Sequence, residues 1–337
     1  MSAESEILRS FLESPRRDGR PRRYAYLGPE ATFTEAALRS LPEAAEAERI
    51  PFPTVAATLG AVRDGMVEAA MAPLENSVEG PVPATLAELV ANDLHIVAET
   101  HVRVEFTLIA ASGARLDDVR TILSHPHALA QCGRWLRQWL PNARQDTAPS
   151  TAAAARSVAE AGARSGLAAI AAPLAAERYR LEVLAVDIGD RSDAVTRFVL
   201  LRRPGPPAPR SGVDRTSILA MADKDHPGWL RDVLESFASR GVPVTRIDPR
   251  PSGDGLGRYH FLIDCEGHVL DRPVEDALKG VEQNGAEVRF LGSYPRDAWP
   301  LARACVDGRP SAFLAVARSV VRRGDGVSPP PSSSRSP

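Results

Sequence analysis

The sequence predicts an α/β protein built from two lobes and followed by a smaller domain with the ferredoxin-like order βαββαβ. Between residues 24 and 90, short apolar strands alternate with helical stretches, which favours a parallel sheet with helices on its faces. An extended stretch at 94–111, rich in β-branched residues, interrupts the rhythm, and a second series of strands and helices follows it. A stretch at 204–212, rich in proline and glycine, then precedes the last group of elements.

The first series has strands and helices in alternation. They are expected at residues 24–28 (strand), 33–41 (helix), 49–53 (strand), from 54 (helix), 69–74 (strand) and 82–90 (helix). The hydroxyl of Thr54 is suited to cap the second helix, because side-chain oxygens at this position accept from free backbone N–H groups.

The second series repeats the pattern. Its elements are expected at 121–124 (strand), 128–139 (helix), 143–147 (strand), 151–162 (helix) and 167–172 (strand), with a further strand at 196–201. Two α/β lobes joined by extended crossings predict a ligand cleft between them, where strand C-termini and helix N-termini converge.

The last group of elements has a different order. Its members are expected at 216–221 (strand), 228–240 (helix), 242–247 (strand), 259–264 (strand), 274–282 (helix) and 287–291 (strand). The segment DGLG at 254–257 lies between two strands rather than before a helix, so it predicts a turn and not a nucleotide-binding loop. Both chain ends are polar, which predicts a flexible leader at 1–22 and a largely disordered tail at 297–337.

The composition is that of an ordinary globular protein, with 337 residues, 44% hydrophobic and a net charge of −2. A near-neutral chain is not expected to bind nucleic acid, which usually requires a basic stripe. The apolar runs fall short of the about 18 residues that span a bilayer, so we expect a cytoplasmic protein with no membrane partner. Three scattered cysteines and the pair His125 and His127 lack zinc-ligand spacing, so neither a disulfide nor a bound metal is predicted.

Five short strings resemble those of the prephenate dehydratase family and occur in that family's order. They are YLGPEATFTEAAL (26–38), PLENSVEGPVPATLAEL (73–89), SHPHALAQC (124–132), STAAAA (150–155) and VTRF (195–198). Residues 214–296 resemble the ACT regulatory module that follows in that family, including its ending FLGSYPR (290–296).

The resemblance implies a periplasmic-binding-protein-like catalytic domain, a ferredoxin-like ACT domain and assembly as a homodimer or homotetramer. The implied boundaries are a leader at 1–22, a catalytic domain at 23–203, a linker at 204–213, an ACT domain at 214–296 and a tail at 297–337. One catalytic lobe is expected at about 23–100 plus 190–203, and the other at 101–189.

The resemblance also implies an activity, the decarboxylation and dehydration of prephenate to phenylpyruvate in phenylalanine biosynthesis. Loss of carbon dioxide pushes electrons through the substrate ring and expels the ring hydroxyl, so no cofactor or metal is expected. The protein has to hold a dianion in one orientation and supply a donor to the departing hydroxyl.

The signature at 195–198 implies that Thr196, Arg197 and Phe198 are catalytic. Thr196 is the expected donor, and its alternative role is that of a β-branched residue in a strand. Arg197 is suited to bind a substrate carboxylate through its forked donors, and a structural ion pair is an equal alternative.

The other strings imply the substrate-binding residues. These are Thr32, Glu75, Asn76, Ser77, His125, Ser150 and Thr151. Thr32, Ser150 and Thr151 stand where helices begin, so they are suited to present an anion to the helix N-terminus or to cap the helix. His125 either binds a carboxylate or packs against its loop. Glu75 is expected to orient its neighbours or to face the hydroxyl end of the substrate, because an ionised carboxylate would repel a dianion.

The sequence departs from the family pattern at several positions. Ala31 stands where the family has glycine, which strains the backbone if φ is positive there, and His127 replaces a glutamine. The effector-binding positions also differ from the family strings; they are Gly228, Trp229, Leu230, Asp248, Arg250 and Pro251. Since Trp229 adds an indole where phenylalanine would lie, we expect phenylalanine feedback to be altered or lost.

Three other functions are compatible with the same scaffold. An arogenate dehydratase is not distinguished by any residue. A non-aromatising prephenate decarboxylase is disfavoured, because the resemblance implies that such enzymes lack the acid at Thr196. A non-catalytic amino-acid sensor would lose the acid and keep the effector residues, which is the reverse of this sequence.

Overall fold

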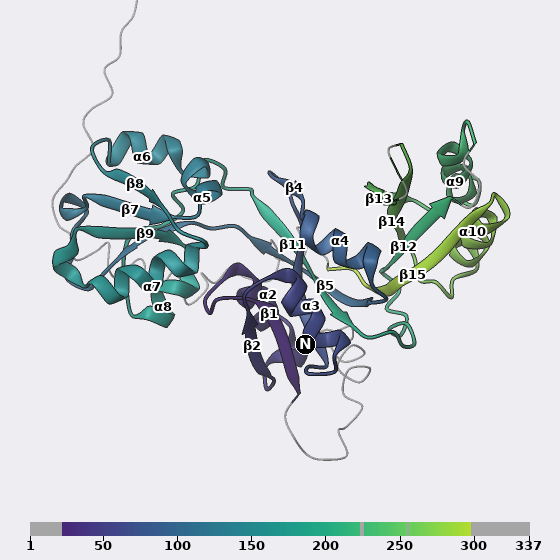
Figure 1. Cartoon of the computed structure of the whole chain (residues 1–337), viewed down its shortest axis with the longest axis horizontal. Coiled ribbons are helices and arrows are strands. Elements are labelled where there is room, and N and C mark those ends of the chain that lie inside the picture. Colours follow the sequence, from purple (N-terminus) through teal and green to yellow (C-terminus); the bar gives the residue numbers. More distant parts are fainter. Residues whose placement is uncertain (1–21, 223–225, 254, 256, 298–337) are drawn as a thin grey trace, which may run out of the picture. The chain divides into compact units, whose positions relative to one another are not determined.

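The computed structural model describes residues 22–222, 226–253, 255 and 257–297, and its strands form three sheets (Figure 1). The predicted leader up to residue 21 and the predicted tail from residue 298 lie outside the described residues, as does part of the predicted turn at 254–257. Within the described ranges, every helix is too short or too polar to pass through a lipid bilayer.

The first lobe consists of the sheet β2-β1-β3-β11-β5 and three helices. Its elements are β1 (Arg23–Leu27), α2 (Phe33–Ser40), β2 (Glu48–Phe52), α3 (Val55–Arg63), β3 (Ala69–Asn76), β4 (Gly80–Pro81), α4 (Pro83–Ala91), β5 (His95–Arg103) and β11 (Val195–Arg202). β1 runs parallel to β2 and β3, as the alternating pattern predicts, whereas β11 runs antiparallel to β3 and β5. α2 packs on one face of the sheet, and α3 and α4 pack on the other. Thr54 caps α3 as predicted, with its hydroxyl accepting from the Ala57 N–H at 3.1 Å.

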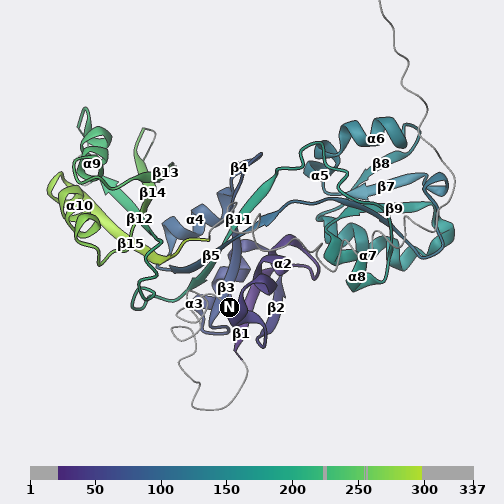
Figure 2. The same ribbon diagram turned by 180° about the vertical axis from the view of Figure 1, so that it is seen from behind.

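The second lobe consists of the sheet β10-β6-β9-β7-β8 between two layers of helices (Figures 1 and 2). Its elements are β6 (Thr107–Ala110), β7 (Thr121–Ser124), α5 (Pro126–Gln131), α6 (Gly133–Trp139), β8 (Arg144–Thr147), α7 (Thr151–Ala161), β9 (Leu167–Ala171), α8 (Pro173–Tyr179) and β10 (Glu182–Ala185). Alternate residues of β9 face opposite layers, since Ile170 joins the cluster under α5 and α6 while Ala169 joins the cluster under α7 and α8.

Two features of the second lobe differ from the sequence prediction. The helix expected at 128–139 is two helices that meet at Cys132, whose φ of −110° and ψ of 9° break the helical path. The elements α8 and β10 were not predicted, because a seven-residue helix and a four-residue half-buried edge strand carry little periodicity.

Two extended segments connect the lobes and run side by side. The stretch predicted at 94–111 is two strands, β5 in the first sheet and β6 in the second. The chain returns to β11 along this crossing, where the Val104 N–H donates to the Ala194 carbonyl at 2.8 Å. Arg103 adds a hydrogen bond to the Ser192 carbonyl at 2.8 Å. The strand that carries Thr196 therefore begins at the junction between the lobes.

The C-terminal module has the predicted ferredoxin-like order. Its elements are β12 (Asp214–Ala222), α9 (Trp229–Ala238), β13 (Val244–Pro251), β14 (Tyr259–Glu266), α10 (Arg272–Gln283) and β15 (Ala286–Pro295). All pairings in its sheet, β13-β14-β12-β15, are antiparallel, and α9 and α10 cover one face. Three short 3-10 helices lie elsewhere in the described chain, η1 (Pro42–Ala44), η2 (Leu116–Asp118) and η3 (Ala163–Ser165).

The other face of this third sheet shares a hydrophobic core with the first lobe. Leu219, Leu291 and Tyr294 of the module belong to the same buried cluster as residues of α3, α4 and β3. At Gly292 the backbones of β15 and β5 come so close that a Cβ atom would lie 2.1 Å from the Ile96 carbonyl oxygen. Only glycine fits at this crossing, which explains its place in the string FLGSYPR.

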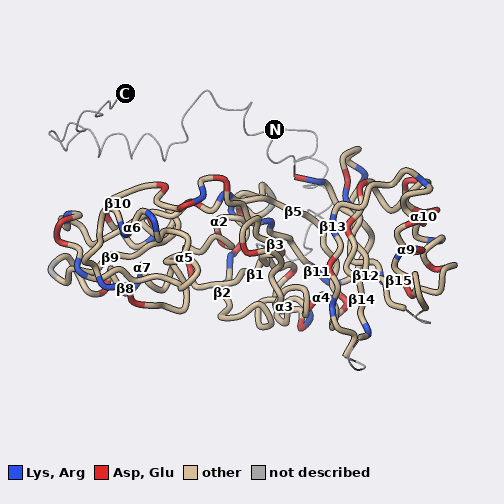
Figure 3. Tube along the Cα trace, turned by 90° about the horizontal axis from the view of Figure 1, so that it is seen from above, with Lys and Arg blue, Asp and Glu red and all other residues tan. Residues whose placement is uncertain are grey.

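Charged residues of both signs are intermixed along the described chain (Figure 3). Many of them meet in exposed ion pairs, such as Lys279 with Glu275 and Arg144 with Asp146. Exposed pairs of this kind contribute little to stability. A second group of charges is buried between the first and third sheets.

Candidate active site

Thr196 and Asn76 face each other where β11 begins and β3 ends, and their side chains are hydrogen bonded. The amide Nδ2 of Asn76 donates to Thr196 Oγ1 at 2.8 Å. The amide oxygen of the same residue accepts from the backbone N–H groups of Val78 at 2.8 Å and Glu79 at 2.9 Å. These two bonds fix the amide so that its NH2 group faces Thr196. Because an amide NH2 only donates, the Thr196 hydroxyl keeps its own proton for another acceptor.

A β-bulge lies beside this pair. In the pairing of β11 with β3, Arg197 is opposite Glu75 and Phe198 is opposite Pro73, so Leu74 is left without a partner. Bulges of this kind occur next to active sites and change the direction of neighbouring side chains. Phe198 is buried in the core of the first lobe. The ring packs against apolar side chains of this core, and the catalytic role expected for Phe198 stays a prediction.

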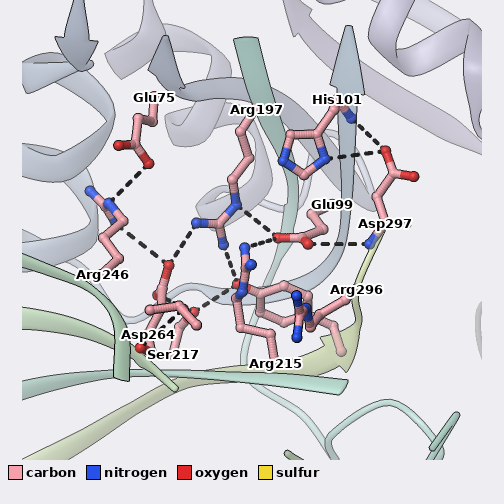
Figure 4. A network of polar contacts seen from close by, with 12 residues as sticks. Glu75, Glu99, His101, Arg197, Arg215, Ser217, Arg246, Asp264, Arg296 and Asp297 are labelled. Carbon is pink, nitrogen blue, oxygen red and sulfur yellow. Dashed lines mark hydrogen bonds and ion pairs between the residues drawn. The ribbon is translucent and has the colours of Figure 1, made fainter. Parts of the chain in front are cut away.

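Arg197 is buried, and each nitrogen of its guanidinium has a protein acceptor (Figure 4). Nε donates to Glu99 at 2.7 Å, Nη1 to Asp264 at 2.6 Å and Nη2 to the Tyr294 hydroxyl at 2.9 Å. Burial alone would lower the pKa of Arg197, but Asp264, Tyr294 and Glu99 together raise it. Of the two roles expected for Arg197, the geometry matches the structural ion pair.

Ser77 and Glu75 flank Asn76 and differ in their surroundings. Ser77 is exposed and closes the end of the β3–β11 pairing, since its N–H donates to the Val195 carbonyl at 2.8 Å and its hydroxyl accepts from the Val195 N–H at 3.0 Å. Glu75 is half-buried and lies 3.5 Å from Nε of Arg246 in the C-terminal module (Figure 4). Glu75 is thus partly neutralised by a cation, which reduces its repulsion of an anionic ligand.

Thr32 caps α2 at the end of the loop that follows β1. Its hydroxyl accepts from the Glu35 N–H at 3.3 Å and donates to the Leu27 carbonyl at 3.0 Å, so the capping role expected as one alternative is present. Ala31, just before it, has φ of 67°, which is the strained conformation anticipated for a residue replacing glycine. The buried carboxylate of Glu35 accepts from the Ala31 N–H at 2.6 Å and so supports this turn.

The predicted residues of the second lobe also stand at helix starts. Ser150 caps α7, with its hydroxyl accepting from the Ala153 N–H at 3.0 Å, and Thr151 is the first residue of that helix. His125 caps α5 by accepting from the His127 N–H at 3.3 Å. Burial, followed by the neighbouring His127, lowers the pKa of His125, so its ring is neutral at pH 7.

Glu79 joins the strand-end group to the second lobe. Its carboxylate accepts from Gln131 at 2.8 Å and lies 3.7 Å from Nδ1 of His127. The structure thus brings Glu75, Asn76, Ser77 and Thr196 together and connects them through Glu79 to the loop of His125. Glu79 was not among the predicted residues. Its position within the family string at 73–89 could have identified it as a site residue.

The expected effector positions fall into two groups in the C-terminal module. Gly228, Trp229 and Leu230 line a cavity of about 510 Å³ at the start of α9. Trp229 is buried against Phe261, and its Nε1 has no hydrogen-bond partner among the described residues. Asp248, Arg250 and Pro251 lie on β13 instead, where Asp248 pairs with Arg246 and with Arg250.

Metal ligands do not gather in the described part of the chain, which contains no group of three or more histidine, cysteine or acidic side chains able to hold an ion. Cys132 and Cys265 are buried free thiols, and burial raises the pKa of each to about 12. Neither thiol is therefore a nucleophile at neutral pH.

Known proteins resemble this chain over most of its length. A family model described as prephenate dehydratase matches residues 24–206. A prephenate dehydratase of Mycobacterium ulcerans is 44% identical over 283 residues, covering 81% of this chain and 88% of that protein. A solved prephenate dehydratase from Arthrobacter aurescens, in complex with L-Phe, has 45% identity and a TM-score of 0.76, and the match covers 89% of this chain and 98% of that one. A further structure, GqqA, described as a novel type of quorum quenching acylase, has 33% identity and a TM-score of 0.73 over 82% of this chain and 99% of that one.

Proposed function

This chain belongs to the prephenate dehydratase family, and we propose that it converts prephenate to phenylpyruvate with Thr196 as the donor to the departing ring hydroxyl. Prephenate and one proton give phenylpyruvate, carbon dioxide and water. The bond to the ring carboxylate breaks, its electron pair enters the ring, and the bond to the ring hydroxyl breaks as that oxygen is protonated. The enzyme is a carbon–oxygen lyase.

The hydrogen bond from Asn76 to Thr196 carries this proposal. A threonine hydroxyl is a very weak acid, so it assists only by a hydrogen bond that strengthens as charge grows on the leaving oxygen. Asn76 occupies a lone pair of Thr196 at 2.8 Å and thereby turns the O–H away from itself. A proton from solvent completes the formation of water.

The same geometry argues against an acylase, the activity by which GqqA is described. Attack on an amide by Thr196 would require a base that removes the hydroxyl proton. The side chain bonded to Thr196 is the amide of Asn76, and its NH2 group cannot accept a proton. Dehydration is therefore the better-supported reaction.

The direct test follows phenylpyruvate by its absorbance in alkali after incubation of the purified protein with prephenate. We expect Thr196→Ala to lower kcat by about 10²- to 10⁴-fold and Thr196→Ser to stay within about tenfold of the original protein. A loss below about tenfold for Thr196→Ala contradicts the assignment. A product without the aromatic spectrum would identify decarboxylation without dehydration, and a parallel assay with arogenate measures substrate preference.

We further propose that phenylalanine feedback is altered or lost, although the C-terminal module has the order expected of an ACT domain. The support is Trp229, whose indole lines the cavity at Gly228 and fills space that a smaller residue would leave open. The cytoplasmic location, expected from the short apolar runs, and the assembly as a homodimer or homotetramer, implied by the family resemblance, stay predictions.

A further inference from the structure

The buried charges between the first and third sheets form one connected network (Figure 4). Arg197 lies at its centre, bonded to Glu99 of β5, Asp264 of β14 and Tyr294 of β15. Arg215 of β12 donates to the same oxygen of Glu99 at 2.7 Å. A single guanidinium thus connects the strand of Thr196 to two strands of the C-terminal module.

A second chain of contacts joins the module to the strand beside Thr196. Ser217 donates to Asp264 at 2.6 Å, and Nη1 of Arg246 lies 3.8 Å from the same residue. The other side of Arg246 faces Glu75, which pairs with Arg197 in the β3–β11 register. Residues adjacent in sequence to both Thr196 and Asn76 therefore contact the module.

This network of buried charges fixes the orientation of the groups that it joins more than it stabilises the fold. The Glu99 side chain is 0% exposed and that of Asp264 is 3% exposed, so both charges have been taken out of water. Removing charges from water costs free energy that an ion pair at best restores, and apolar contacts of the same size hold two sheets together at least as well. A guanidinium with three fixed acceptors differs from an apolar contact in that its orientation is fixed.

We propose that Arg197 is a positioning residue, which fixes Thr196 in the orientation needed for catalysis by tying β11 to Asp264 and Tyr294 of the C-terminal module. This inference rests on the proposed role of Thr196. In this proposal Arg197 makes no contact with the substrate, because its side chain is 7% exposed and each of its three nitrogens already donates to a protein group. The module then sets the rate of the chemical step even in the absence of any effector.

The test compares Arg197→Lys with Arg215→Lys in the full chain, using the prephenate assay and thermal unfolding. Both changes remove one of the two guanidinium groups on the same Glu99 oxygen, but only Arg197 is next to Thr196. We expect Arg197→Lys to lower kcat by about 10- to 100-fold with KM within about threefold, as for other groups that orient reacting residues. Arg215→Lys is expected to keep kcat within about twofold while lowering the unfolding midpoint.

Further variants test whether Arg197 acts on the rate through Thr196 or only stabilises the fold. In a Thr196→Ala background, Arg197→Lys is expected to cost less than about twofold, because a residue that acts through Thr196 has nothing left to position. Asp264→Asn, on the module side, is expected to lower kcat in the same direction as Arg197→Lys. If Arg197→Lys fails to fold, Tyr294→Phe removes only one hydroxyl from the guanidinium and is expected to lower kcat with KM unchanged.

Equal losses of kcat for Arg197→Lys in the two backgrounds would overturn the inference, as would equal kcat values for Arg197→Lys and the original protein. A rise of KM alone would mean that Arg197 binds substrate. These outcomes differ from a failure of the proposed function, in which the original protein itself forms no phenylpyruvate.

Discussion

Replacing Asn76 by aspartate changes one atom of the candidate site and reverses its hydrogen bonding. One carboxylate oxygen can still accept from the N–H groups of Val78 and Glu79, so the turn is retained. The other oxygen takes the place of Nδ2, 2.8 Å from Thr196 Oγ1. An ionised carboxylate only accepts, so the Thr196 hydroxyl has to donate to it and its proton is no longer free for the substrate.

The size of the effect follows from this bond. A hydrogen bond to a charged group contributes about 1.5–3 kcal/mol, and it has to break before Thr196 can assist the departing hydroxyl. That cost corresponds to a loss of about 10- to 150-fold in kcat. The added negative charge also repels a dianionic substrate, so KM is expected to rise.

The assay is steady-state formation of phenylpyruvate between pH 5 and 8, with Asn142→Asp as a matched control in an exposed turn. A protonated aspartate regains a donor, so the ratio of Asn76→Asp activity to the original activity is expected to rise as the pH falls toward 5. A kcat within about threefold of the original at pH 8 would refute the proposed orientation of Thr196.

Five other outcomes are expected. At Ala31, where φ is 67°, the relief of strain by glycine and the loss of a buried methyl group each amount to about 1 kcal/mol, so Ala31→Gly should leave stability nearly unchanged. A β-branched side chain is far less compatible with this φ, so Ala31→Val should lower the free energy of unfolding by more than about 2 kcal/mol in urea titrations. Gly292→Ala should destabilise by at least about 3 kcal/mol, because the new Cβ would lie 2.1 Å from the Ile96 carbonyl oxygen, and unchanged unfolding would contradict that close approach. Burial raises the pKa of Asp264, but Arg197 and Arg246 outweigh it and hold the pKa at about 2, below its ordinary 3.8. Stability of about 2 kcal/mol is therefore present above pH 4 and lost as the pH falls toward 2, and acid titrations of Asp264→Asn should lack this component. Calorimetry should give a phenylalanine Kd weaker than about 100 μM, and tighter binding with matching inhibition would show that Trp229 does not alter the effector site.

The sequence patterns predicted most of the helices and strands, because these depend on residues that are close together in the chain. Alternation of strands and helices gave the two lobes and the ferredoxin-like module, and the family strings pointed to Thr196 and Asn76, whose side chains prove to be bonded. Their hydrogen bonds depend on the pairing of β3 with β11, between residues 120 positions apart, which no periodicity encodes.

The partners of Arg197 illustrate what the sequence could not supply. Glu99 lies in a stretch recognisable only as a strand, and Asp264 belongs to another module. The resemblance indicated that Arg197 matters but left open whether it binds substrate or a protein carboxylate. The packing of one sheet on another brings Glu99 and Asp264 to the guanidinium, which favours the structural ion pair.

The core shared by the third sheet and the first lobe has a practical consequence for dissecting this enzyme. A chain cut at the proline-rich connection around 204–213 would lose Leu219, Leu291 and Tyr294 from the shared core and would expose the apolar side chains packed against them. It would also leave the guanidinium of Arg197 without Asp264 and Tyr294. Such a fragment is expected to aggregate rather than to behave as an unregulated catalyst. For protein engineers, the response to an effector is therefore better changed by point substitutions at the cavity beside Gly228 than by truncation.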